Sequence, residues 1–184
     1  MSKEDKQALL QRIMKEYPNS IISTLDEYKT VSEFISTGST ILDRALGTMG
    51  VPMGRVVEFL GVESAGKTSI ANSVIYNGQR KGYEALFVDL EFAYNKEFAV
   101  DMFGINPDML TVARPGSAED AMGIMEAYID ADAAKIIVLD SISSLIGEEE
   151  IEKDFDDPEK IGTHAKLVTR LIKRIVPACG AKDI

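Results

Sequence analysis

One stretch of the sequence combines glycines, a lysine and a hydroxyl residue at a spacing that suits phosphate binding. Residues 61–68 read GVESAGKT and match the pattern G-x-x-x-x-G-K-[ST]. In such a loop successive backbone N–H groups surround an anion, and the following helix adds the positive end of its dipole. The alternative is a glycine-rich turn between a strand and a helix. The predicted nucleotide-binding residues are Gly61, Val62, Glu63, Ser64, Ala65, Gly66, Lys67, Thr68 and Ser69.

The individual side chains of this loop have separate predicted roles. Lys67 is expected to reach the β- and γ-phosphates of ATP, and the Thr68 hydroxyl is expected to ligate Mg²⁺. Asp140 follows the apolar run Ile136–Leu139 and is the expected second group at Mg²⁺. An aspartate at this place is also typical of a helix cap, which is the alternative interpretation.

A further carboxylate stands at the end of another apolar run. Glu91 follows Ala85–Leu90, and in a parallel sheet it would share an edge with the phosphate loop and Asp140. A carboxylate at that place can orient and deprotonate an attacking water. The spacing leaves two alternatives open, an ordinary surface acid at Glu91 or Asp89 in its place.

From residue 55 onward, apolar segments typical of strands alternate with segments that have helical spacing. These elements would position the phosphate loop, Asp140 and Glu91. Continuous apolar strands separated by helices predict an α/β fold, with a parallel sheet covered by helices on both faces. The expected strands are Val56–Leu60, Ala85–Leu90, Thr111–Ala113 and Ile136–Leu139. The expected helices are Ser69–Lys81, Asn95–Phe103, Ala118–Ala131 and Ile161–Val176.

The N-terminal part has a different pattern. Residues 8–17 carry an apolar stripe at helical spacing that ends before Pro18, and residues 19–34 have the composition of a linker. We therefore predict two parts, residues 1–34 as a helix with its linker and residues 35–184 as the α/β core. Nothing nearby in the sequence covers the stripe, so it is expected to pack on its own domain or on another chain.

The composition of the chain excludes several classes of protein. The chain has 184 residues, 45% of them hydrophobic, a net charge of −10, one cysteine and one histidine. These values fit a globular domain and argue against strong nonspecific binding to nucleic acid or anionic membranes. No apolar run approaches the ~20 residues of a membrane helix, and the charged N-terminus has no apolar signal core. We expect a cytoplasmic protein with no membrane association, no internal disulfide and no structural zinc site.

Several stretches resemble the bacterial RecA recombinase family beyond the general phosphate-loop pattern. ISTGSTILDRALGTMGVPMGRVVEF precedes the loop, FVDLEFAYNKEFA contains Glu91, and IIVLDSISSL contains Asp140. The resemblance extends from about residue 6 to 178, and EEEIEKDFDD is a weaker match to the start of the family's first DNA-binding loop. The family fold implied is a RecA-like ATPase core preceded by an N-terminal helix.

The resemblance implies a function and roles for residues. Members of the family are DNA-dependent ATPases that form helical filaments on single-stranded DNA and pair it with homologous duplex in recombination and repair. Glu91 matches the glutamate that activates water, and Asn95 and Phe98 fall where the family contacts adenine, although the family more often has Asp and Tyr there. The N-terminal helix would pack on the neighbouring subunit of the filament. The expected cofactors are ATP and Mg²⁺.

The DNA-binding stretch departs from the family pattern. Residues 148–159 are strongly acidic and contain Pro158, and acidic groups repel phosphates. Basic residues follow, and Lys166 and Lys173 align with DNA-contacting positions of the family. A solvated helix face is the alternative. His164 has no evident partner and is expected in a loop. The acidic stretch is compatible with a phage-encoded version.

The family has further elements after the last predicted helix. They include a strand between the phosphate-loop strand and the Asp140 strand, and a second DNA-binding loop. PACGAKDI resembles neither, so the sequence predicts a core truncated before its last strands. The alternatives are an inactive or partial fragment of a recombinase, such as one exon of a split gene, and another RecA-fold ATPase such as a helicase motor.

Overall fold

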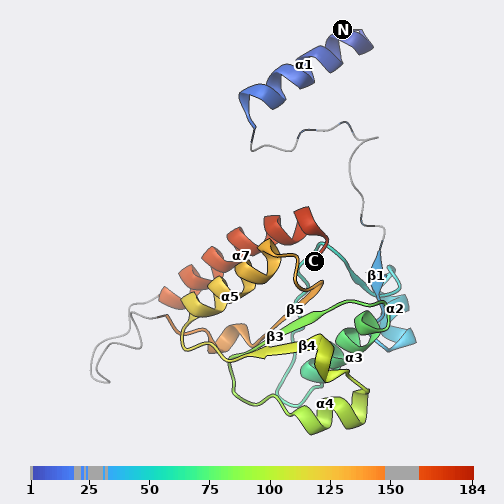
Figure 1. The fold of residues 1–184 in the computed structure, drawn as a ribbon, viewed down its shortest axis with the longest axis vertical. Coiled ribbons are helices and arrows are strands. Elements are labelled where there is room, and N and C mark those ends of the chain that lie inside the picture. The colour runs from blue at the N-terminus through green and yellow to red at the C-terminus, as the bar shows by residue number, and fades with distance from the viewer. Residues whose placement is uncertain (1, 19–21, 23, 25–30, 32, 148–161) are drawn as a thin grey trace. The chain divides into compact units, whose positions relative to one another are not determined.

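The structure is a computed structural model of the chain that describes residues 2–18, 22, 24, 31, 33–147 and 162–184. Figure 1 shows its elements. The chain divides into two compact units, residues 1–31 and 32–184. The first contains helix α1 (Lys3–Glu16), which begins with a capping box: Ser2 Oγ accepts from the Asp5 N–H and the Asp5 carboxylate accepts from the Ser2 N–H. Leu9, Met14 and Tyr17 of the predicted stripe are exposed.

The second unit is built on a parallel sheet of three strands, counted over the described residues. Its order is β4 (Leu110–Ala113), β3 (Ala85–Asp89) and β5 (Ile136–Asp140). In this register Val88 lies opposite Ala113 and Leu139, and Asp89 lies opposite Asp140. The strand ends therefore place Asp89, Asp140 and the residues that follow them at one edge of the sheet.

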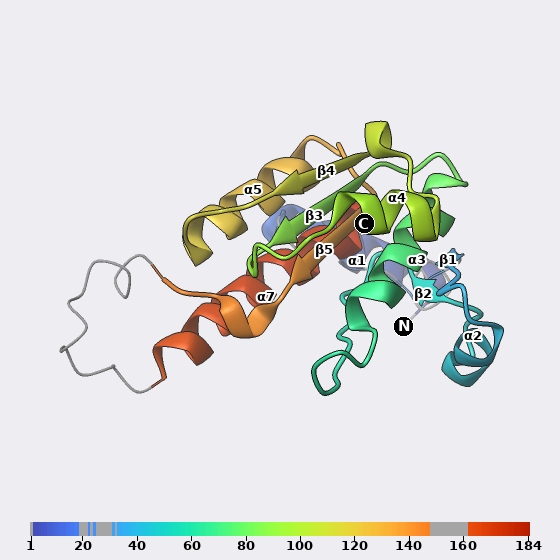
Figure 2. The same ribbon diagram turned by 90° about the horizontal axis from the view of Figure 1, so that it is seen from below.

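Helices cover both faces of the sheet, as the alternating pattern predicts (Figures 1 and 2). Leu86 and Val88 of β3 face α5 (Ala118–Asp130) and α7 (Thr163–Lys182). Ala85 and Phe87 face the opposite way, toward α3 (Lys67–Gln79) and α4 (Lys96–Phe103). This division follows from the period of two in a strand, which sends successive side chains to opposite faces.

A small antiparallel pair, which the sequence did not predict, precedes the phosphate loop. β1 (Phe34–Ile35) pairs with β2 (Val51–Pro52), and α2 (Thr40–Leu46) lies between them in the chain. Asp43 organises the turn before α2, since it accepts hydrogen bonds from the Ser36 hydroxyl and from the hydroxyl and N–H of Thr37. Burial alone would raise the pKa of Asp43, but these hydrogen bonds outweigh it and lower the pKa below its ordinary value.

The prediction that Val56–Leu60 forms a strand is wrong. These residues belong to no helix or strand, and Val56 and Leu60 are 54% and 83% exposed. A strand needs a neighbour for its N–H and C=O groups. Among the residues that the structure describes, no strand lies beside this segment or on the outer edge of β5.

The last helix is longer at its C-terminal end than predicted. α7 begins at Thr163 and continues through Pro177 to Lys182. Its buried residues Leu167, Leu171, Ile175 and Cys179 keep helical spacing beyond the proline and pack in the α5 layer. Burial therefore outweighs the loss of one backbone hydrogen bond at Pro177. The acidic stretch 148–159 lies outside the described residues.

Candidate nucleotide-binding site

The phosphate loop leads directly into α3. Gly66 is the residue before the helix, and its φ of +88° lies in the left-handed region that favours glycine. The first N–H groups of any helix lack intrahelical acceptors, so the first turn of α3 presents donors at the loop. Lys67 folds back over the loop, and its Nζ donates to the carbonyls of Gly61 and Val62, at 3.0 Å each. The other loop side chains, from Val62 to Ala65, are exposed.

The structure brings the Thr68 hydroxyl to the Asp140 carboxylate. Thr68 Oγ1 donates to Asp140 Oδ2 at 2.7 Å, across 72 positions of sequence. A hydroxyl and a carboxylate are hard oxygen donors of the kind that Mg²⁺ prefers. The two residues predicted to hold the metal therefore lie close enough to share one cation, and their chemistry fits it.

Glu91 lies at the same edge, beside Asp140. Ser141 Oγ donates to Glu91 Oε1 at 2.8 Å, and the hydroxyls of Ser143 and Ser144 lie 2.7 and 3.3 Å from Ser141 Oγ. The Leu90 N–H also donates to the Asp140 carbonyl at 2.8 Å. The carboxylate predicted to activate water is thus held by a serine cluster next to the predicted metal ligands.

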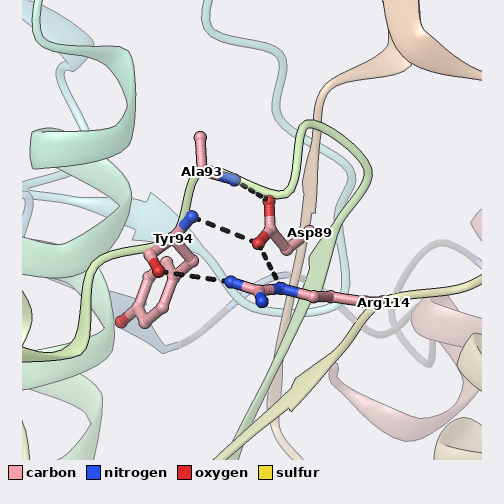
Figure 3. Close-up of polar contacts among 4 residues, drawn as sticks. All are labelled: Asp89, Ala93, Tyr94 and Arg114. Carbon is pink, nitrogen blue, oxygen red and sulfur yellow. Dashed lines mark hydrogen bonds and ion pairs between the residues drawn. The ribbon is translucent and has the colours of Figure 1, made fainter.

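Asp89, the competing carboxylate, has different surroundings (Figure 3). It is 2% exposed and accepts hydrogen bonds from the N–H groups of Ala93 and Tyr94, at 3.1 Å each. Arg114 Nε donates to Asp89 Oδ2 at 3.0 Å. These contacts occupy both oxygens of Asp89 with the backbone and an arginine, whereas Glu91 is exposed.

The residues expected at the adenine lie around the start of α4. Asn95 caps the helix, and its side-chain oxygen accepts the N–H of Phe98 at 2.8 Å. The Phe98 ring is 45% exposed and meets Phe103 edge-on at 5.4 Å between ring centroids. Both positions therefore lie at the surface on one turn, and their contact with a base stays a prediction.

The basic residues near residue 170 form an exposed face of α7. Lys166, Arg170 and Lys173 are exposed and line a shallow groove together with Ala165, Thr169 and Arg174. Arg174 is engaged by Glu126 of α5, with Nη2 at 2.6 Å from Oε2. His164 lies in the first turn of α7 rather than in a loop, and its Nε2 is 2.9 Å from the Ile142 carbonyl.

Sequence reasoning missed several residues around the Glu91 loop. Ser141, Arg114, Tyr94 and Asn72 had no predicted role, yet each contacts the loop or its carboxylate. One available signal was Asp89 itself, a carboxylate inside the apolar run Ala85–Leu90. A carboxylate buried with such a run needs hydrogen-bond donors. The position of its arginine partner, 25 residues later, follows only from the pairing of β3 with β4.

Comparison with known proteins identifies the family. The family model for the RecA N-terminal domain matches residues 4–182. The chain belongs to the RecA family. Protein RecA of an Arthrobacter species is 39% identical over 169 residues, which is 91% of this chain and 48% of that protein. Protein RecA of Saccharopolyspora erythraea is 38% identical over 170 residues, 92% of this chain and 49% of that protein.

A third relative gives the same result. Protein RecA of Clostridium acetobutylicum is 37% identical over 169 residues, covering 91% of this chain and 48% of the relative. The chain therefore spans about half the length of the curated relatives it matches. Within the described residues, no helix of this RecA family member is long and apolar enough to cross a membrane.

Proposed function

We propose that this chain binds and hydrolyses ATP as part of a DNA recombinase. The recombinase would assemble into a helical filament on single-stranded DNA and pair that strand with homologous duplex. The observation that carries the proposal is the 2.7 Å contact between Thr68 of the phosphate-loop helix and Asp140 of β5, with Glu91 beside it. Family membership supports the DNA function, and a bacterial cytoplasm or a phage-infected cell would be the place of action.

The binding step would use the phosphate loop. Lys67 Nζ would exchange its bonds to the carbonyls of Gly61 and Val62 for oxygens of the β- and γ-phosphates. The N–H groups of the loop and of the first turn of α3 would bind the same phosphates. Thr68 and Asp140 would hold Mg²⁺, which neutralises phosphate charge when it is bound. Asn95 and Phe98 would contact the adenine.

The hydrolytic step would use Glu91 as the base. Its carboxylate would orient a water for attack on the γ-phosphate and accept the proton of that water. Ser141 donates to one Glu91 oxygen, which leaves the other oxygen of the carboxylate for the water. Lys67 would stabilise the charge on the transferred phosphoryl group, so catalysis depends mainly on positioning and electrostatics.

ATP binding is tested with a fluorescent ATP analogue and Lys67→Ala, with Lys81→Ala as the control. Lys81 pairs with Glu33 away from the loop. We expect Lys67→Ala to weaken binding at least about tenfold, since a charged hydrogen bond contributes ~1.5–3 kcal/mol. Equal affinity of the two variants would refute the proposed site, and binding without hydrolysis would favour an inactive fragment.

DNA binding is tested on the basic face of α7. The double variant Lys166→Gln/Lys173→Gln should lower the slope of log affinity against log salt for single-stranded DNA by about 1.4, because each phosphate contact contributes about 0.7. Lys81→Gln/Lys135→Gln makes the same change of net charge elsewhere on the unit. If both double variants give the same slope, α7 does not bind the strand. Electron microscopy of filaments formed with ATP and DNA would separate a recombinase from a helicase motor.

A further inference from the structure

The loop between β3 and α4 carries Glu91, and it is fastened on both sides of that residue. Before Glu91, the Leu90 N–H donates to the Asp140 carbonyl. After it, the N–H groups of Ala93 and Tyr94 donate to Asp89. Glu91 and Phe92 therefore lie between two fixed points, and the second point depends on a single buried carboxylate.

We propose that Arg114, acting through Asp89, is the positioning residue that holds Glu91 in place for ATP hydrolysis. The inference rests on the proposed function. Arg114 follows the end of β4, the strand beside β3, and it reaches over to the loop with two groups at once. Its Nε donates to Asp89 Oδ2 at 3.0 Å, and its Nη2 donates to the Tyr94 carbonyl at 3.4 Å (Figure 3).

Arg114 is needed at Asp89 because a buried carboxylate requires compensation of its charge. Asp89 is 2% exposed, and two backbone N–H groups supply hydrogen bonds but no full positive charge. The Arg114 side chain is 47% exposed, so it can bring a cation to Asp89 while the rest of the guanidinium stays in water. Without that cation, Asp89 would be a buried charge held by the loop amides alone.

Arg114 also covers the residue next to Glu91. Its Cζ lies 5.8 Å from the centroid of the Phe92 ring. Phe92 has a φ of +55°, a left-handed conformation that costs an aromatic residue about 1–2 kcal/mol. The cation over the Phe92 ring and the two hydrogen bonds of Arg114, to Asp89 and Tyr94, act on residues on both sides of Glu91, so they hold the conformation that presents it.

The turn is connected to the phosphate-loop helix as well. Tyr94 Oη donates to Asn72 Oδ1 at 3.1 Å, and Asn72 is a buried residue of α3 one turn after Thr68. The Tyr94 ring packs on Phe87 of β3 with 4.3 Å between centroids. Fixing Tyr94 from both sides therefore fixes the Glu91 loop relative to the helix that would bind the phosphates.

Lysine and glutamine cannot replace Arg114 fully. Lysine supplies a point charge but not the fork of donors that reaches Asp89 and Tyr94 together, and glutamine supplies no charge. We therefore expect Arg114→Gln to lower kcat for ATP about tenfold, which is less than the ~100-fold that a 1 Å misplacement of a catalytic group can cost. Arg114→Lys should have an intermediate kcat. Affinity for the fluorescent ATP analogue should change much less than kcat in both variants.

The decisive experiment is a double-mutant cycle with Glu91→Gln, measured as single-turnover hydrolysis in the purified protein. If Arg114 acts through Glu91, Arg114→Gln has little further effect in the Glu91→Gln background. An equal loss in both backgrounds, or a loss confined to ATP affinity, would overturn the inference. Lys81 is a cation of similar exposure to Arg114, and its ion pair with Glu33 lies away from the loop, so Lys81→Gln should leave kcat unchanged.

A second measurement does not depend on activity. Amide hydrogen exchange should become faster at Ala93 and Tyr94 in Arg114→Gln, while the amides of Leu86–Val88 in the sheet keep their protection. Unchanged exchange in the loop would refute the positioning role. If the wild-type protein bound no ATP but the loop still loosened in the variant, the proposed function would fail while the structural part of this inference stood.

Discussion

The Glu91 loop and the phosphate loop were both predicted to follow buried strands, but in the structure only one of them does. The Glu91 loop, residues 90–95, follows the central strand β3, whose five residues are all buried. The phosphate loop, residues 61–66, follows Val56–Leu60, which belongs to no sheet and is largely exposed. The Glu91 loop is held by the buried Asp89 side chain at the end of β3. The phosphate loop is held where Gly66 leads into α3. Pairing with neighbouring strands, which β3 has and Val56–Leu60 lacks among the described residues, accounts for this difference.

The largest contrast between the two regions is expected in stability. Phe87 is 1% exposed and packs against Tyr94, so Phe87→Ala should lower the free energy of unfolding by about 3–5 kcal/mol. Urea unfolding would measure it. A loss below about 0.5 kcal/mol would contradict the central position of β3, since that is the range of surface substitutions.

The next effect concerns stability at high pH, and of the two loops it is expected only in the Glu91 loop. Burial raises the pKa of Tyr94 to about 12, whereas an unfolded tyrosine ionises near pH 10. Between these values the unfolded state loses the proton first, so stability should fall with rising pH by up to about 1.4 kcal/mol per unit. Below pH ~10 both states are protonated and the contribution is fully present.

Tyr94→Phe should remove the part of the stability loss at high pH that comes from ionisation of Tyr94. Denaturant unfolding midpoints measured from pH 9 to 12 would show it. Tyr83 has its pKa raised by its hydrogen bond to Glu33 and continues to contribute, so Tyr83→Phe is the matched control. Identical pH profiles of Tyr94→Phe and the wild type would show that the loop is more open than its contacts indicate.

A smaller effect is expected at the start of the phosphate-loop helix. Gly66→Ala places a side chain at a φ of +88° and should cost about 1–2 kcal/mol. Affinity for the ATP analogue should fall as well, because the strain moves the N–H groups of the loop. Gly123→Ala in α5 has open space around it and should be neutral or stabilising by up to about 1 kcal/mol. Equal effects of the two would mean that the loop rearranges without cost.

The smallest effect should come from the segment before the phosphate loop. Val56→Ala removes an exposed side chain and should change stability by less than about 0.5 kcal/mol. A loss of several kcal/mol, as at Phe87, would mean that Val56–Leu60 is part of a packed sheet in solution. That outcome would restore the predicted strand and remove the contrast between the two loops.

Local patterns predicted most of the elements because their causes are local. The helices α3, α4 and α5 and the strands β3, β4 and β5 lie within a few residues of their predicted bounds. The spacing of their apolar residues, and the glycine or asparagine found where some of them begin or end, can be recognised within short stretches of consecutive residues. The strand at Val56–Leu60 and the end of α7 were mispredicted because both depend on distant partners. Pairing decides the first, and packing against α5 decides the second.

The sequence by itself determined the family, the α/β class and the chemical groups of the site. A loop with Gly66, Lys67 and Thr68 at fixed spacing predicts phosphate binding from consecutive residues alone. The tertiary structure decided what surrounds each carboxylate. Asp89 faces the same side of β3 as Phe87 and is enclosed by loop amides and Arg114, whereas Glu91 emerges beside Ser141 and Asp140. The parallel pairing of β3 with β4 brings Arg114 to Asp89, and its pairing with β5 brings Ser141 and Asp140 to Glu91. No local sequence pattern predicts which strands pair.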